Sequence, residues 1–267
     1  DFVGEFAAPL PQFVMTTILG WPLDDLPMLR EWGEAQVRRF VFGQGHRNLM
    51  SPEEEVENAE DLGKFMEYVH EQVKYKRENP GDDMTTFLTQ VEYKAMGRKL
   101  TDQEVIGVLF GMHIGGLETT QYAIAAQAEL IAQDPALFAE LKADPSKIRF
   151  FCEEGMRLHS PTQGLSTRMA AKDVEIRGIK VPKGSILHLR YGAANRDEEE
   201  YENNTEIKLD RPNIGRHMTF SQGIRVCPGA GISRLEQNVA WERLTQRLET
   251  FTLAEGKNDF RHQPGIM

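Results

Sequence analysis

The stretch from Thr101 to Ala132 limits the possible folds of this chain more than any other part of the sequence. Thr101 and Glu104 have the spacing of a capping box, which predicts that a helix begins there. Asp134-Pro135 predicts where it ends. The predicted helix is much longer than an average globular helix and is apolar on most sides of its first half, so we expect it to cross the protein interior.

The middle of this predicted helix contains residues that a buried helix tolerates poorly. Gly115 and Gly116 lower helix stability, and Glu118 brings a carboxylate into an apolar setting. Such a conflict between local rules is typical of a functional site. For Thr119 the alternative is a hydroxyl bonded back to its own helix, and for Glu118 it is a solvated or paired carboxylate.

The remaining sequence predicts a mainly α chain with a small β portion. Ser51 to Glu54 form another capping box. Further helices are predicted near residues 3–19, up to about 42, and over 51–78, 84–94, 146–159 and 229–248. Short strands are predicted within 164–169, 174–177, 179–184 and 186–191, and 195–220 lacks regular structure. Since neither a linker nor a repeat interrupts the sequence, we expect one domain over residues 1–267 and no second domain.

Charge and hydropathy exclude several classes of partner. The 31 basic and 41 acidic residues give a net charge of -10, which argues against a nucleic-acid partner because phosphate binding needs a basic face. No apolar run approaches the length of a membrane span, and the first residues lack a signal-peptide pattern. We therefore expect a cytoplasmic protein that does not contact a membrane.

The two cysteines, Cys152 and Cys227, have different surroundings. Two cysteines without a C-x-x-C pair support neither a disulfide scaffold nor a zinc site. Cys227 follows Arg225 and precedes the last predicted helix, and both the cation and the helix N-terminus favour a thiolate. This pattern indicates a ligand or a nucleophile. The alternative is a small buried thiol, which is what we expect of Cys152.

The spacing around Cys227 matches a known motif. Phe220-x-x-Gly223-x-Arg225-x-Cys227-x-Gly229 resembles the haem-binding loop of cytochromes P-450. In that family the cysteine thiolate is the proximal ligand of the haem iron. The resemblance implies that Cys227 ligates the iron of haem b and that the other four motif residues contact the cofactor.

Glu154-x-x-Arg157 also matches the family, in the expected order along the chain. The resemblance implies a buried structural triad of Glu154, Arg157 and Arg211 that holds the loop presenting the cysteine. Taken alone, this spacing is more typical of a surface ion pair.

Gly115-Gly116-x-Glu118-Thr119 resembles the motif on the long central helix of the family. The resemblance implies that the glycines lie against O2 and haem, and that Glu118 and Thr119 deliver protons to bound dioxygen. His113 lies off this face of the helix, so we expect it to be packed in the interior.

Arg168 lies where the family places a second arginine that pairs with a haem propionate, and the alternative is an ordinary exposed strand residue. Helical spacing and the resemblance together predict a substrate pocket at Gly111, Ile114, Gly164 and Leu165. Ile114 and Leu165 could equally be core residues.

The resemblance covers essentially the whole sequence, but the family fold is longer. We therefore expect the cytochrome P-450 fold, truncated at the N-terminus and slightly at the C-terminus. The implied activity is a monooxygenase that inserts one atom of O2 into a small apolar organic substrate. Electrons would come from NAD(P)H through a separate ferredoxin- or flavodoxin-type donor, since no nicotinamide or flavin fingerprint is present. A peroxide-using haem-thiolate enzyme and a truncated haem-binding fragment without activity are the alternatives.

Overall fold

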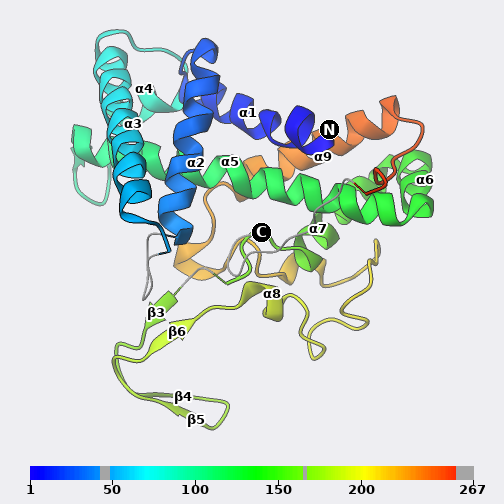
Figure 1. Ribbon diagram of the computed structural model, residues 1–267. Helices are drawn as coiled ribbons and strands as arrows, with labels where there is room; N and C mark the ends of the chain where they lie inside the picture. Colours follow the sequence, from blue (N-terminus) through cyan, green and yellow to red (C-terminus); the bar gives the residue numbers. More distant parts are fainter. Residues whose placement is uncertain (43–48, 165–166, 257–267) are drawn as a thin grey trace. The chain divides into compact units, whose positions relative to one another are not determined.

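The computed structural model describes residues 1–42, 49–164 and 167–256 (Figure 1). The predicted fold class, mainly α with a small β portion, is confirmed. The chain forms two compact units, Asp1–Gln121 and Tyr122–Met267. The long helix α5 (Asp102–Gln133) has residues in both units. None of the helices in the described part of the chain combines the length and the apolar character that a membrane crossing needs.

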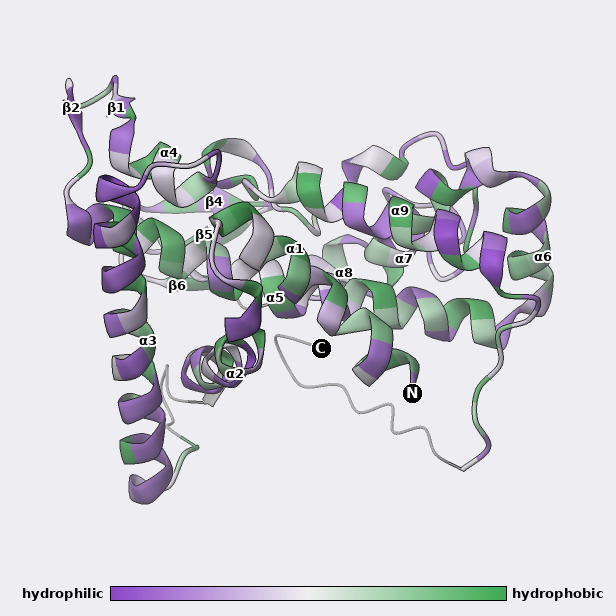
Figure 2. Ribbon diagram, turned by 90° about the horizontal axis from the view of Figure 1, so that it is seen from above, coloured by the Kyte–Doolittle hydropathy of each residue, from purple (hydrophilic) through white to green (hydrophobic). Residues whose placement is uncertain are grey.

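The first unit is helical apart from one small hairpin. A π-helical turn at Val3–Ala7 leads into α1 (Pro9–Leu19), α2 (Leu26–Phe42), α3 (Pro52–Glu78) and α4 (Met84–Gln90). Strands β1 (Glu92–Tyr93) and β2 (Arg98–Lys99) precede α5. Helices α2 and α3 pack against each other (Figure 1), and most residues of α3 are hydrophilic (Figure 2).

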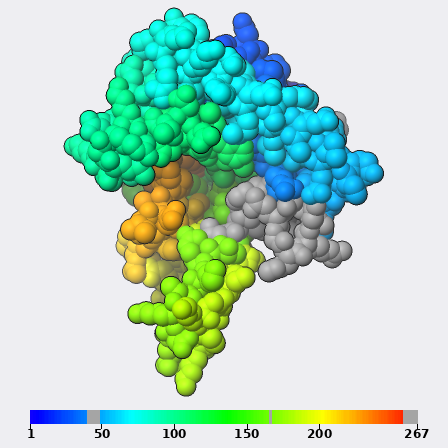
Figure 3. All heavy atoms as spheres, turned by 90° about the vertical axis from the view of Figure 1, so that its left-hand side faces the viewer, coloured from blue at the N-terminus to red at the C-terminus, as the bar shows by residue number. Residues whose placement is uncertain are grey.

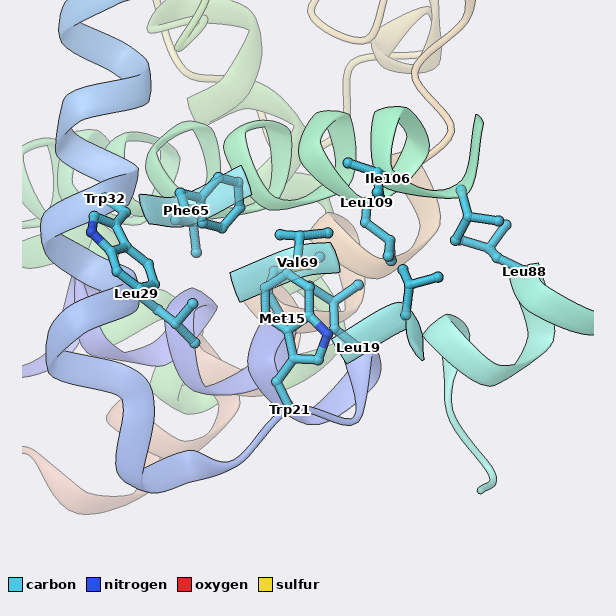
Figure 4. Close-up of a cluster of buried hydrophobic side chains, with 13 residues drawn as sticks. Met15, Leu19, Trp21, Leu29, Trp32, Phe65, Val69, Leu88, Ile106 and Leu109 are labelled. Atoms are coloured by element: carbon cyan, nitrogen blue, oxygen red, sulfur yellow. The ribbon is translucent and has the colours of Figure 1, made fainter. Parts of the chain in front are cut away.

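The core of the first unit is aromatic and aliphatic (Figure 4). Trp21, Phe65 and Leu109 come from three different parts of the chain and are almost completely buried. The ring centroids of Trp21 and Phe65 lie 6.3 Å apart in an edge arrangement. These contacts bury the apolar face of the polar helix α3 against α5.

Both predicted capping boxes are present. The Ser51 hydroxyl accepts from the Glu54 backbone N–H, and the Glu54 side chain accepts from the Ser51 N–H. Glu104 likewise accepts from the Thr101 N–H at 2.8 Å. Hydrogen bonds from Arg98, and then from Thr101, lower the pKa of Glu104 to about 2. The start of α5 is thereby tied to β2.

The second unit begins with the last part of α5. Helices α6 (Pro135–Ala143), α7 (Ile148–Leu158), α8 (Tyr191–Ala194) and α9 (Ala230–Arg247) follow. Strand β3 (Thr167–Met169) pairs with β6 (Ile186–His188), and β4 (Val174–Ile176) pairs with β5 (Ile179–Val181). The β4–β5 hairpin projects as a yellow-green finger (Figure 3).

The structure differs from the sequence prediction at α4 and α6, among other elements. The helix predicted over 84–94 ends at Gln90, because the chain turns into the β1–β2 hairpin. Helix α6 was not predicted, although Asp134 caps it by accepting hydrogen bonds from the backbone N–H groups of Ala136 and Leu137. The same Asp-Pro pair that ends α5 therefore also begins α6.

Candidate cofactor site

The segment from Phe220 to Gly229 presents Cys227 at the surface of the second unit. A 3-10 turn at Gly223–Arg225 leads to the cysteine. The Cys227 backbone N–H donates to the Phe220 carbonyl oxygen at 2.8 Å and closes the loop. The Cys227 thiol is exposed, whereas Cys152 is buried and burial raises the pKa of its thiol. Cys227 is therefore the cysteine that a cofactor could reach.

The backbone conformation of this loop favours glycine at only one of its two motif glycines, Gly223 and Gly229. Gly223 has a φ of 72°, a left-handed conformation that favours glycine. Ser221 adopts a similar φ of 59° and carries the strain of a side chain there. Gly229 has a φ of -83°, and a Cβ at this position would lie 3.8 Å from the Cys227 sulfur, an ordinary contact.

Helix α9 begins directly after the cysteine, with Gly229 at its N-cap. The first N–H groups of a helix have no partner within the helix and point toward a group placed at its N-terminus. Arg225 is exposed two residues before Cys227 and can pair with a carboxylate. The apolar side chains of Ile224 and Val226 are 98% and 53% exposed beside it.

Glu154, Arg157 and Arg211 lie together in the interior of the second unit. The Arg157 Nε and Nη2 donate to the two carboxylate oxygens of Glu154 at 2.6 and 3.0 Å. The Arg211 Nε donates to Glu154 Oε1 at 2.9 Å. All three side chains are at most 3% exposed, so this is a buried network and not a surface pair.

The two arginines also hold the irregular segment after α8. Arg157 donates to the carbonyl oxygens of Asn195 and Asn204 at 3.0 and 2.6 Å, and Arg211 donates to that of Glu202 at 2.7 Å. The guanidinium groups lie 5.0 and 5.7 Å from the ring centroid of Tyr201. The triad thus fixes a segment that has little regular structure of its own.

Asn195 connects this segment to the cysteine loop. Its side-chain amide donates to the Thr219 hydroxyl at 2.9 Å, and its side-chain oxygen accepts from the Met218 backbone N–H at 2.6 Å. The Thr219 hydroxyl donates to the Met156 carbonyl oxygen at 2.8 Å. Neither the role of Asn195 nor the partly buried cluster of Glu153, His217 and Arg234 was predicted from the sequence.

The residues predicted for oxygen chemistry lie on α5 in the first unit. The Thr119 hydroxyl donates to the Gly115 carbonyl oxygen at 2.6 Å, the arrangement that was the alternative for this residue. Glu118 is half-buried. A Cβ on Gly116 would lie 2.5 Å from the Met15 sulfur, whereas one on Gly115 would meet no atom within 4 Å.

The remaining predicted residues are scattered. Gly111 is exposed and Ile114 is half-buried, both in the first unit. Gly164 is buried in the second unit, where a Cβ would lie 2.9 Å from the Arg190 Cδ. Arg168 is exposed on β3 and donates to the carbonyl oxygen of its neighbour Thr167 at 2.7 Å. Leu165 lies outside the described residues.

The donor chemistry of the loop fits a haem. An exposed sulfur at a helix N-terminus is suited to hold iron as a thiolate. The exposed apolar side chains at 224 and 226 suit a large apolar ring, and Arg225 suits the carboxylates at its edge.

Several known proteins are similar to this chain in both sequence and fold. The cytochrome P-450 family pattern matches residues 50–267. The chain is 30% identical over 265 residues to the biotin biosynthesis cytochrome P-450 of Bacillus subtilis, covering 99% of this chain and 64% of that protein. It is 29% identical over 267 residues to the polyketide biosynthesis cytochrome P-450 PksS of the same organism, covering 100% and 62%.

A solved structure agrees. P-450BioI, crystallised with an acyl carrier protein ligated to hexadec-9Z-enoic acid, superposes with a TM-score of 0.87 at 29% identity, covering 99% of this chain and 65% of that one. The chain thus spans somewhat less than two thirds of the length of these relatives. The predicted fold is confirmed, and the chain belongs to the cytochrome P-450 family.

Proposed function

We propose that the protein carrying this chain is a haem-thiolate monooxygenase. The observation that carries this proposal is the exposed Cys227 thiol, held on an anchored loop at the start of α9. The substrate would be a small apolar organic molecule that receives one atom of O2.

The residues of the second unit would bind the cofactor. Cys227 would hold the iron, and Arg225 and Arg168 would pair with the propionates. Phe220, Gly223 and Gly229 would contact the ring through the loop. When bound, haem b supplies the binding and activation of O2, which side chains cannot provide.

The residues of α5 would make room for O2 and deliver protons to it. Gly115, which has open space beside it, would leave room for the cofactor and O2, whereas Gly116 makes room for the Met15 side chain. Thr119 holds a proton on Oγ1, at present donated to the Gly115 carbonyl oxygen. Glu118 would replace that proton, because a carboxylic acid next to an alcohol can relay protons from solvent.

Electrons would come from NAD(P)H through a separate ferredoxin- or flavodoxin-type donor.

The substrate pocket would be lined by Gly111, Ile114, Gly164 and Leu165. The hexadec-9Z-enoic acid bound with P-450BioI is a largely apolar molecule of the kind proposed here.

The test replaces each cysteine in the haem-loaded full-length protein. Cys227→Ser should abolish the thiolate-type absorption of the reduced carbonyl complex, because an alcohol does not replace the thiolate. Cys152→Ser is the matched control and should retain it, since that thiol is buried elsewhere. Retained absorption in Cys227→Ser would refute the ligand assignment. Turnover faster with peroxide than with a reductase would favour the peroxide-using alternative.

A further inference from the structure

A second carboxylate on α7 is the direct neighbour of the triad and binds different partners. Glu153 Oε1 accepts from Arg234 Nε at 2.6 Å, and Oε2 accepts from Arg234 Nη2 at 3.1 Å. His217 Nε2 lies 2.8 Å from the same Oε2. The His217 Nδ1 accepts from the Thr219 backbone N–H at 3.3 Å, so a neutral ring with its hydrogen on Nε2 satisfies both contacts.

We call these three residues the Glu153 cluster. Two of them, His217 and Arg234, flank the cysteine loop along the chain. His217 precedes the loop, and Arg234 belongs to the start of α9, which follows it. The Arg234 guanidinium lies 4.5 Å from the centroid of the Phe220 ring. Since the Phe220 carbonyl oxygen accepts the Cys227 N–H, Arg234 contacts the residue that closes the loop.

The cluster is largely shielded from solvent. The side chains of His217 and Glu153 are 1% and 17% exposed, and Arg234 is the most open at 37%. Burial alone would raise the pKa of Glu153, but hydrogen bonds from His217 and Arg234 outweigh it and lower the pKa. A charged carboxylate in this setting makes strong, directional hydrogen bonds.

We propose that Glu153 is a positioning residue for the iron-ligating thiolate, acting through Arg234 and His217. This inference rests on the proposed function. The two adjacent carboxylates of α7 would hold different segments. Glu154 would hold the segment that ends at Arg211, and Glu153 would hold the loop between His217 and Arg234.

The test uses Glu153→Gln in the haem-loaded full-length protein. Glutamine keeps the size and one acceptor oxygen but removes the charge. We expect the ratio of thiolate-type to other reduced carbonyl complexes to fall roughly tenfold, the effect of losing one charge-assisted hydrogen bond. Haem transfer to an apo-globin acceptor should become faster. Arg234→Gln should lower the ratio as well, and the double variant should lose less than the two single losses combined, because the two residues share the Glu153–Arg234 contact.

Two controls separate positioning from stability. Glu199→Gln removes an exposed ion pair with Arg177 and should leave the ratio unchanged. Leu141→Ala weakens the buried core at α6, which contains no residue of the loop or cluster, and should lower thermal stability without changing the ratio. A wild-type ratio in Glu153→Gln, or an equal loss in Leu141→Ala, would overturn the positioning role. Wild-type protein without thiolate-type absorption would instead refute the proposed function.

Discussion

His113 illustrates how a buried side chain makes the stability of the first unit depend on pH. It is 1% exposed, its Nδ1 lies 3.0 Å from Gln36 Oε1, and its ring lies 4.7 Å from that of Phe65. Burial lowers the pKa of His113 to about 4. His113 is thus packed in the interior, as its position off the Gly115–Thr119 face of the helix predicted.

We expect the free energy of unfolding to fall as the pH drops from about 6.5 to about 4. In that window the unfolded chain binds a proton on His113 and the folded chain does not, so acid favours unfolding. The loss should be up to about 3 kcal/mol. Urea unfolding at several pH values measures it. His113→Gln should flatten this dependence, while the exposed His70→Gln should not; equal slopes in the two variants would contradict the assignment.

Substitutions of Thr119 can test whether its hydroxyl only bonds its own helix or also delivers protons to O2. Thr119→Ala removes the hydroxyl that donates to the Gly115 carbonyl oxygen. If the protein has the proposed monooxygenase activity, we expect product formed per NAD(P)H consumed to fall by roughly an order of magnitude or more, because Thr119 would no longer deliver protons to O2. Thr119→Ser keeps the hydroxyl and should restore much of the coupling. Unchanged coupling in the alanine variant would remove Thr119 from proton delivery.

At the level of elements, α5, α7 and α9 are joined by a buried polar network in the second unit. Gln127 donates to the Cys152 carbonyl oxygen at 3.1 Å and accepts from Trp241 Nε1 at 2.7 Å. Gln127 also hydrogen-bonds Gln237. Gly155 of α7 makes room for this side chain, since a Cβ there would lie 2.6 Å from the Gln127 Cγ.

Gly155→Ala should therefore destabilise the protein. Overpacking costs about 1–3 kcal/mol and the gain in helix propensity offsets about 1 kcal/mol, which leaves a net loss of up to about 2 kcal/mol. Gly63→Ala on α3 is the matched control, because its Cβ would meet no atom within 4 Å. It should instead stabilise by about 0.5–1 kcal/mol. Thermal unfolding of both variants provides the comparison, and equal shifts would show that Gln127 can move aside.

The elements also show how far the sequence alone could go. The starts of α3 and α5 were predictable because capping boxes are local, and so was the strand character of β3 to β6. Helix α6 was missed because Asp134-Pro135 was interpreted only as an end. The triad was found through a family motif. The Glu153 cluster was not, because Glu153 is separated by more than sixty residues from both His217 and Arg234 and meets them only after folding.

For the whole molecule, the expected cofactor should be a main source of stability. A ligand that binds only the folded state stabilises it by about 2.7 kcal/mol at a hundredfold excess over its Kd. Removal of haem should therefore lower the unfolding temperature. Amide exchange over 223–227 should become faster, since Ile224 and Val226 lose the surface that covers them. Unchanged exchange in this loop on haem removal would contradict the assignment of the site.

The adjacency of Glu153 and Glu154 also constrains how this protein can change over evolution. Successive residues of a helix point about 100° apart, so inserting one residue before this pair would give Glu153 the direction that Glu154 now has and would turn Glu154 away from its own partners. A single substitution elsewhere in α7 leaves the contacts of Glu153 and Glu154 in place, but a length change before them disrupts the contacts of both carboxylates at once. We therefore expect gaps in related sequences to fall in the surface hairpins and to spare this helix.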